Sequence, residues 1–356
     1  MKVANILSAL ALMLFTSVQV FGNTESEQAE KFNPTETIME HIKDAHYWHF
    51  FDKKDAEGNL HPVAMPLPVI VYANNQLDVF MSSKFEHGHA TVTCGTNQYI
   101  LHHEKIYLAN QYGQMEFDEA GNPTNVAALD FSITKNVASM MLSAVLLLLI
   151  FVGSARAYEK HGQVPTGLRG FTEPLILFVK EDIAEPNLGK NADRFLPYLL
   201  TVFFFIWINN MLGLLPASAN LTGNIAVTFT LSFITMILTN VFASKHYWIE
   251  KFSMPGVPWW LQPVMTVVEF IGVISKPFAL MIRLFANISA GHIIVLSLIS
   301  LIFIFQTVFI APVSIAFVLF MDVLELLVAA LQAYIFTMLS ALFIGLAVNM
   351  GAEHEH

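Results

Sequence analysis

Arg283 is a cation that lies deep in an apolar stretch, where a charged side chain is energetically unfavourable. The 105 residues from 252 to 356 contain only two Lys or Arg residues, Lys276 and Arg283. A charge at the centre of a membrane costs about 2.5–3.5 kcal/mol on insertion scales, so such residues usually serve a function. Arginine keeps its proton in proteins and therefore supplies a positive charge that moving protons do not neutralise. The alternative is a cation that snorkels to the interface or is paired in the interior.

Small residues surround Arg283 on its side of a predicted helix. At about 100° per residue, Ala279, Asn287 and Ala290 lie within roughly 40° of Arg283. Small residues let another membrane helix approach closely. We therefore expect Arg283 to face a partner surface, although alanine is also common in membrane helices generally.

Acidic residues are as rare as cations in the last two long apolar stretches, which contain Glu269, Asp322 and Glu325. Glu325 and Gln332 are seven residues apart, which puts them on one face of a helix and about 10 Å apart along its axis. An acid at this depth in a membrane is by default a candidate for ion transfer.

His292 follows Arg283 by nine residues, so it points to the opposite side of a helix and lies about 13 Å further along. Histidine titrates near physiological pH and can exchange protons there. An ordinary buried histidine is the usual interpretation of a lone His. The acids in the same apolar region strengthen the functional interpretation here.

Five apolar segments are long enough to position these groups across a membrane. They are residues 137–152 with their flanks, 195–215, 224–243, 264–309 and 313–350. The fourth is about 65–70 Å long as a helix, roughly twice the hydrocarbon thickness. Each of the last two could be a hairpin of two helices, but neither contains a clustered turn signal. A single tilted or bent helix is therefore favoured for each. Residues 170–180 are short and amphipathic and are expected at the membrane interface.

Composition restricts the class of protein. The chain is 55% hydrophobic and 13% charged, whereas soluble domains carry roughly 25% charged residues. A net charge of −10 does not suggest a nucleic-acid-binding protein. The single cysteine, Cys94, excludes an internal disulfide, a thiol-ligated zinc site and a CxxC redox pair. No GxxxxGK[ST] loop is present, so we expect no nucleotide site on this chain. We also expect no cofactor, no metal and no catalytic role for the chain itself.

The N-terminal third is predicted to be exported. Residues 1–22 resemble a signal peptide, with Lys2 before an apolar run and a cleavage site before Asn23. An uncleaved first membrane helix is the alternative. Residues 23–132 are polar and form a small domain of mixed or uncertain fold. Segments 69–72, 77–82 and 99–101 have strand composition, and 37–51 could be a short helix.

Cations between the apolar segments orient the chain. The cations between the first and second segments are Arg156, Lys160, Arg169, Lys180, Lys190 and Arg194, and those after the third are Lys245 and Lys251. The turns at 216–223 and 310–312 carry no cation. By the positive-inside rule the cationic loops are cytoplasmic. We therefore expect a multi-pass protein of a bacterial inner membrane, with residues 23–132 in the periplasm and the C-terminus in the cytoplasm.

Two motifs resemble a known family. The stretch 275–292, SKPFALMIRLFANISAGH, strongly resembles the signature of subunit a of F-type ATP synthases. LQAYIF at 331–336 resembles the second signature of that family, and NNMLGLLP at 209–216 resembles the corner between its second and third spans. The resemblance covers roughly residues 135–350. It implies an all-α polytopic membrane domain over 133–356, with five crossing helices, the last two long and strongly tilted against a ring of c subunits.

The resemblance also implies roles for individual residues. Arg283 matches the arginine that faces the ring carboxylates, and Asn287 and Gln332 match polar residues near it. Glu269 matches an acid lining the cytoplasmic half-channel. His292 and Glu325 match the titratable pair of the outer half-channel, in the order that mitochondrial members carry. The expected partners are the ring of c subunits, b-type peripheral stalk subunits and the rest of the complex.

Three other classes fit less well. An ion antiporter would show internal repeats and its own mid-membrane carboxylates, and a voltage-gated channel would show several Arg at helical spacing. A membrane-anchored metal-binding module is the third. It would use the histidines of the N-terminal domain: His41, His46, His49, His61, His87, His89, His102 and His103.

Overall fold

The computed structural model describes residues 43–54, 60–88, 90–110, 112–161, 167, 169–214, 219–253, 257–305 and 310–350. The chain divides into two compact units, Met1–Leu142 with Leu215–Ala219 and Ser143–Leu214 with Asn220–His356. The predicted signal peptide at 1–22 lies outside the described residues.

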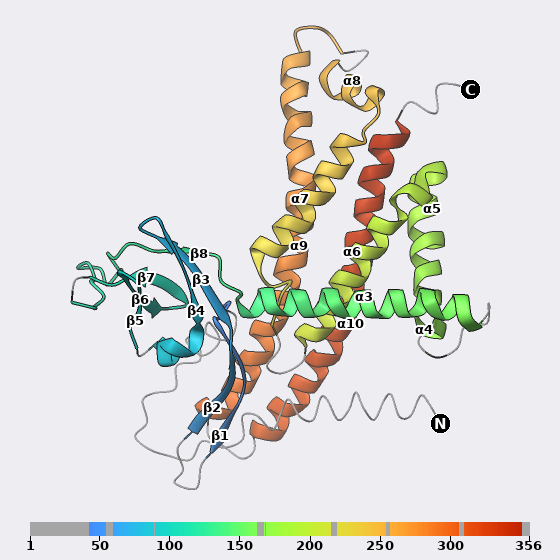
Figure 1. The fold of residues 1–356 in the computed structure, drawn as a ribbon. Coiled ribbons are helices and arrows are strands. Elements are labelled where there is room, and N and C mark those ends of the chain that lie inside the picture. The colour runs from blue at the N-terminus through green and yellow to red at the C-terminus, as the bar shows by residue number, and fades with distance from the viewer. Residues whose placement is uncertain are drawn as a thin grey trace. The chain divides into compact units, whose positions relative to one another are not determined.

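The described part of the first unit is mainly β-structure, shown in blue to teal in Figure 1. Antiparallel pairs link β1 (Tyr47–Lys54) with β2 (Leu60–Pro66), and β3 (Pro68–Ala73) with β4 (Gln76–Met81). The short strand β8 (Leu129–Asp130) pairs with the other edge of β3. The third sheet has the order β5 (Val92–Cys94), β6 (Asn97–His102), β7 (Lys105–Leu108), and the 3-10 helix η1 (Ser82–Gly88) follows β4.

Three predicted strands of this unit are confirmed as β3, β4 and β6. Their side chains alternate, and the inward ones, such as Val69, Val71 and Tyr99, are fully buried. Asn74 and Asn75 both have positive φ, the geometry of a tight hairpin turn between β3 and β4.

The short helix predicted over 37–51 is wrong from Tyr47 onward, because Tyr47–Lys54 is strand β1. The run Tyr-Trp-His-Phe-Phe consists largely of aromatic residues that favour strands. Its backbone pairs with β2 over the whole strand. Residues 37–42 lie outside the described part of the chain.

A buried histidine ties the start of this unit to its end. His46 is 1% exposed, and its Nε2 lies 2.8 Å from Asp130 Oδ2 and its Nδ1 3.4 Å from Glu104 Oε2. Burial lowers the pKa of His46, but the hydrogen bonds and charges of the two carboxylates outweigh it and raise the pKa to about 9. His46 is therefore charged at neutral pH and forms an ion-paired clamp.

Hydrogen bonds hold the residues that connect the sheet to the N-terminus of the first long helix. The Phe131 and Ile133 amides donate to the Ile70 and Pro68 carbonyls, which extends the β3 edge pairing. Asp44 then accepts hydrogen bonds from Thr134 Oγ1 and from the Asn136 amide at the helix N-terminus. A carboxylate at this position satisfies an otherwise free helix amide.

The described residues from Lys135 onward are mainly helical. The helices are α3 (Lys135–His161), α4 (Arg169–Phe178), α5 (Glu185–Leu188), α6 (Ala192–Gly213), α7 (Ile225–Val241), α8 (Lys245–Ser253), α9 (Gln262–Phe305) and α10 (Ile310–Asn349). A π-helical segment η2 (Val179–Ala184) joins α4 to α5, and the 3-10 turn η3 (Gly189–Asn191) precedes α6. The segment 170–180 is thus part of a longer helical run. Val179, Ile183 and Leu188 of this run are fully buried, and its depth in a membrane stays a prediction.

The helix α9 has 44 residues and α10 has 40, each without a break, so the single-helix interpretation of both stretches is confirmed. Four helical segments of the described chain are long and apolar enough to cross a membrane, or up to five if the pair α7–α8, bent by 97°, counts as one. The predicted number of five is within that range. The strong tilt of α9 and α10 stays a prediction.

The helices α9 and α10 pack on each other, and α10 also contacts α6, α7 and α5 (Figure 1). The shared core includes Leu199 of α6, Leu280 and Leu284 of α9, and Phe336 and Ile344 of α10. At Gly345 an added Cβ would clash with the Asn187 carbonyl oxygen, so the missing side chain brings α10 against the backbone before η3. This packing fixes α10 and thereby the groups that it presents to α9.

Candidate functional site

Arg283 lies on an exposed face of α9. Leu280, Leu284 and Ile288 of the opposite face are buried. The side chains of Ala279, Ala286, Asn287 and Ala290 are exposed beside Arg283. The guanidinium makes no hydrogen bond or ion pair with another described residue. The predicted small-residue face around a cation is therefore present and open to an approaching surface.

Asn287 and Gln332 are brought together across α9 and α10. Asn287 Nδ2 donates to Gln332 Oε1 at 3.0 Å. Gln332 is 1% exposed, and its Nε2 is buried without a hydrogen-bond partner among the described residues. Because a buried, unpaired donor is costly, this amide has capacity for a further acceptor.

His292 and Glu325 also meet across these two helices. His292 Nδ1 lies 3.0 Å from Glu325 Oε1. Glu325 Oε1 has no hydrogen-bond partner among the described residues, so this close approach is an ion-pair contact without hydrogen-bond geometry. The Glu325 side chain is 5% exposed and that of His292 is 22% exposed. A nearly buried carboxylate beside an imidazole is an arrangement that can exchange protons.

Gly291 makes room for this pair, which the sequence did not reveal. A Cβ at Gly291 would lie 3.0 Å from both Cδ and Oε1 of Glu325. That separation is tighter than ordinary van der Waals contact, so a larger residue would displace the carboxylate. The isolated glycine in an apolar helix was the signal that could have indicated such a close approach.

Glu269 has a partner that the sequence analysis considered only for topology. Lys251 Nζ of α8 forms an ion pair with Glu269 Oε2 of α9. The ammonium also lies 5.4 Å from the centre of the Tyr247 ring, one helical turn earlier. The sharp bend between α7 and α8 lets α8 fold back against α9 and makes this contact possible.

A cavity of about 310 Å³ adjoins this ion pair and is lined by Asn240, Lys251, Thr266 and Glu269 among others. This volume is large enough for several water molecules. Glu269 thus borders a space of that size.

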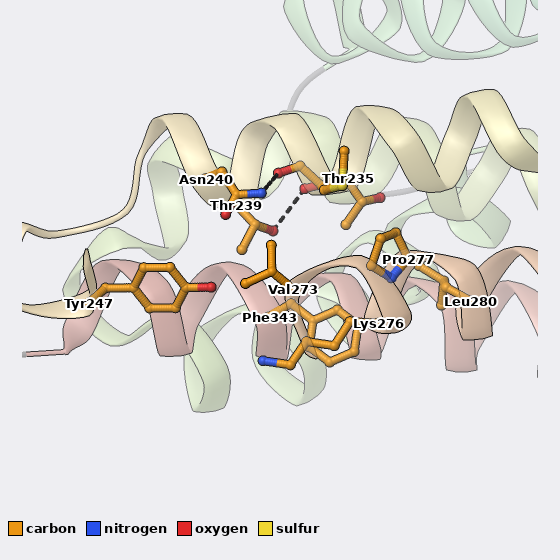
Figure 2. A pocket seen from close by; sticks show the side chains of 10 residues that line it. Thr235, Thr239, Asn240, Tyr247, Val273, Lys276, Pro277, Leu280 and Phe343 are labelled. Atoms are coloured by element: carbon orange, nitrogen blue, oxygen red, sulfur yellow. Dashed lines mark hydrogen bonds between the residues drawn. The ribbon is translucent and has the colours of Figure 1, made fainter. Parts of the chain in front are cut away.

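A second, smaller cavity of about 20 Å³ continues along α9 from the first. Both are lined by Met236, Asn240 and Val273. Figure 2 shows Thr235, Thr239 and Asn240 on one side of the small cavity, and Val273, Lys276 and Phe343 on the other. Its volume is about that needed for one water molecule. The lining ends at Leu280, three residues before Arg283.

The ionisable groups lie on both sides of Arg283 along α9. Glu269 precedes it by 14 residues, about 21 Å, and is rotated from it by only about 40°. His292 follows it by nine residues, about 13 Å, and points to the opposite face. The two groups of side chains are therefore separated both along the helix and around it.

Within the part of the chain that the structure describes, no three His, Cys, Asp or Glu residues are arranged to hold a metal ion. His46 is occupied by its two carboxylates, and the rings of His102 and His103 contact each other at 4.2 Å between centres. His41 and His89 lie outside the described residues.

Comparison with known families gives two matches. A family model described as the ATP synthase A chain matches residues 137–345. A second model, a domain of unknown function, matches residues 37–131.

Curated relatives resemble the chain over most of its length. ATP synthase subunit a of Chloroherpeton thalassium is 49% identical over 236 residues, which cover 65% of this chain and 70% of that protein. ATP synthase subunit a 2 of Chlorobaculum tepidum is 45% identical over 72% of this chain and 74% of the relative. ATP synthase subunit a of Anaeromyxobacter dehalogenans is 42% identical over 73% of this chain and 71% of the relative.

Proposed function

The chain belongs to the ATP synthase A chain family, and from that premise we propose that it supplies two half-channels and the arginine that faces a ring of c subunits. It is a multi-pass, proton-translocating subunit of the membrane sector of ATP synthase. The observation that carries the proposal is the placement of ionisable groups on both sides of Arg283 and on two faces of α9.

The entry half-channel consists of His292, Glu325 and their surroundings between α9 and α10. A proton from the periplasm reaches the pair, whose facing atoms are 3.0 Å apart, and passes to a carboxylate of the ring. Once neutral, that carboxyl can face lipid, because only the charged form is strongly excluded from hydrocarbon. The ring then turns.

The exit half-channel is formed by the two adjoining cavities along α7 and α9. They extend from Glu269 to Leu280, one turn from Arg283, and offer room for water. When a ring carboxyl arrives near Arg283, the positive charge of the guanidinium favours the ionised form of that carboxyl, and the released proton leaves past Glu269.

Arg283 separates the two half-channels. Its charge repels protons that would pass directly between them, and it stays charged at any working pH. One elementary charge that crosses 100 mV yields about 2.3 kcal/mol, so several protons are needed for each ATP. The pairing of an imidazole with a carboxylate supports the proton as the transported ion, because both groups can take up and release protons.

The orientation follows from the cations. We propose that the N-terminal domain, after loss of residues 1–22, is periplasmic and that the C-terminus is cytoplasmic in a bacterial inner membrane. The ring of c subunits packs against the Arg283 face, and b-type stalk subunits hold the chain as part of the stator.

We expect Glu269→Gln to slow proton release on the cytoplasmic side. Glutamine keeps the size of the side chain but cannot take up a proton. Passive proton conduction through vesicles stripped of the catalytic head should fall by roughly 10²-fold, the low end of what a positioned proton-transfer group contributes. Glu250→Gln, an exposed acid on α8, is the matched control and should conduct normally. Equal conduction by both variants would remove Glu269 from the path.

The orientation is testable at the native cysteine. Cys94 in β5 is half-exposed, so a membrane-impermeant maleimide should label it from the periplasmic side of intact inner membrane. In a Cys94→Ser background, a cysteine replacing Lys245 should be labelled only after the inner membrane is opened. Labelling of Cys94 from the cytoplasm alone would reverse the proposed topology.

A further inference from the structure

Asp322 is an acid in α10 that the entry path described above does not use. It lies three residues before Glu325, so the two share a side of the helix and are about 4.5 Å apart along its axis. Its side chain is half-buried and makes no hydrogen bond or ion pair with another described residue. An unpaired acid at membrane depth is energetically costly, so a residue of this kind usually serves a function.

The neighbours of Asp322 are the two groups of the entry pair. Glu325 on α10 and His292 on α9 are the titratable residues that interact electrostatically with the Asp322 carboxyl. Because Asp322 is one helical turn from Glu325 and His292 Nδ1 lies 3.0 Å from Glu325 Oε1, we group the three side chains under the name entry cluster: His292, Asp322 and Glu325.

Asp322 also lies on the side of the pair away from Arg283. Along α10 the polar order is Ser314, Asp322, Glu325 and Gln332, and Gln332 is bonded to Asn287, one turn from Arg283. Ser314 is 4% exposed. This polar file spans 18 residues, about 27 Å of helix. A proton that moves along it towards Gln332 reaches Asp322 before Glu325.

The charge of the cluster indicates what Asp322 does. His292 and Glu325 alone are neutral together, either as an ion pair or with one shared proton. A further proton would give the pair a net positive charge, which is expensive in a buried site and is repelled by Arg283. With an ionised Asp322 the resting cluster carries one negative charge, and the incoming proton makes it neutral.

We propose that Asp322 is a third proton-exchanging residue of the entry path, which attracts the proton and keeps the loaded cluster neutral. This inference rests on the proposed function and deepens it. It applies to proton capture at the outer side, not to transfer at Arg283.

The test measures how much acid the outer side needs. Inverted vesicles are equilibrated at a series of lumenal pH values, and ATP synthesis is started by an alkaline jump outside with a fixed potassium diffusion potential. In Asp322→Asn and Asp322→Ser, the lumenal pH for half-maximal synthesis should fall by about one unit or more, as expected for loss of a nearby negative charge. At the most acidic lumen the maximal rate should stay within about twofold of that of the unmodified chain. Each pH unit of added acidity raises the proton concentration tenfold and so compensates for the weaker proton binding of the variants.

Two further variants make the result specific. Asp322→Glu keeps an exchangeable acid and should keep the half-maximal pH near that of the unmodified chain. Asp182→Asn, an exposed acid between α4 and α5, is the matched control and should not shift the curve. A lower maximal rate with an unchanged half-maximal pH in the uncharged variants would mean a structural role and would overturn the inference.

Glu325→Gln in the same assay separates this inference from the proposed function. If Glu325→Gln abolishes synthesis while both uncharged Asp322 variants give the unmodified curve, only the role of Asp322 is overturned. If Glu325→Gln itself leaves synthesis intact, the entry path and with it the proposed function are overturned.

Discussion

Arg283→Ala is expected to abolish ATP-driven proton pumping and ATP synthesis by the complex that contains this chain. The guanidinium is the permanent cation on the exposed small-residue face of α9. Without it, no positive charge favours the ionised form of a ring carboxyl at the boundary of the two half-channels. The expected loss is complete at the sensitivity of an inverted-vesicle pumping assay, since loss of electrostatic stabilisation at one such contact alone costs about 10²–10³-fold.

Arg283→Lys should not restore coupled synthesis. A lysine in an apolar site loses its proton readily, whereas arginine does not. Passive proton leak through head-stripped vesicles is expected to rise in Arg283→Ala, because no fixed charge then separates the half-channels. Arg194→Ala, a change of an exposed arginine at the start of α6, is the matched control and should pump. Normal synthesis with either change at Arg283 would contradict its role.

The exchange of His292 and Glu325 gives the second large effect. His292→Glu and Glu325→His should each lower proton pumping by on the order of 10²-fold, because each leaves two like groups facing each other in the entry path. The native pair places an imidazole nitrogen 3.0 Å from a carboxylate oxygen, an arrangement that can exchange a proton. The double exchange should recover part of the lost rate.

The structure makes the two single losses unequal. His292→Glu puts three carboxyls into the entry cluster, since Asp322 and Glu325 are already there, and should be the more damaging change. Glu325→His adds an imidazole next to Gly291, where the space for Glu325 is limited, but leaves Asp322 as an acid.

The readout for this exchange is a double-mutant cycle on proton pumping in membrane vesicles. The amount of chain in the membrane serves as the control for assembly. Additive losses, with no recovery in the double exchange, would show that the two residues do not act as one unit.

The functional residues were predictable where a single residue type was out of place. Arg283 and Glu325 are rare charges in apolar sequence, and the cost of burying a charge makes such positions conspicuous without any structure. The uninterrupted stretches that became α9 and α10 were predictable for a similar reason, because they contain no cluster of turn residues. The strands β3, β4 and β6 followed from segments of strand composition that are separated by turn residues.

Local sequence misled at the start of the N-terminal domain. Residues 47–51 were assigned to a short helix but belong to β1, which exists because β2 pairs with it. The pairing depends on β2, a separate segment beyond Lys54, and the pattern within residues 37–51 contains no information about that partner.

What the sequence by itself determined is which groups carry charge at membrane depth and how they are spaced along their own helices. Only the tertiary structure decided which of them meet: Lys251 with Glu269, and His292 with Glu325 beside Gly291. The physical reason is that helix periodicity sets the direction of a side chain relative to its own helix. Which neighbour it contacts depends on how helices pack, and that packing is set by the bend between α7 and α8 and by close approaches at glycines such as Gly345.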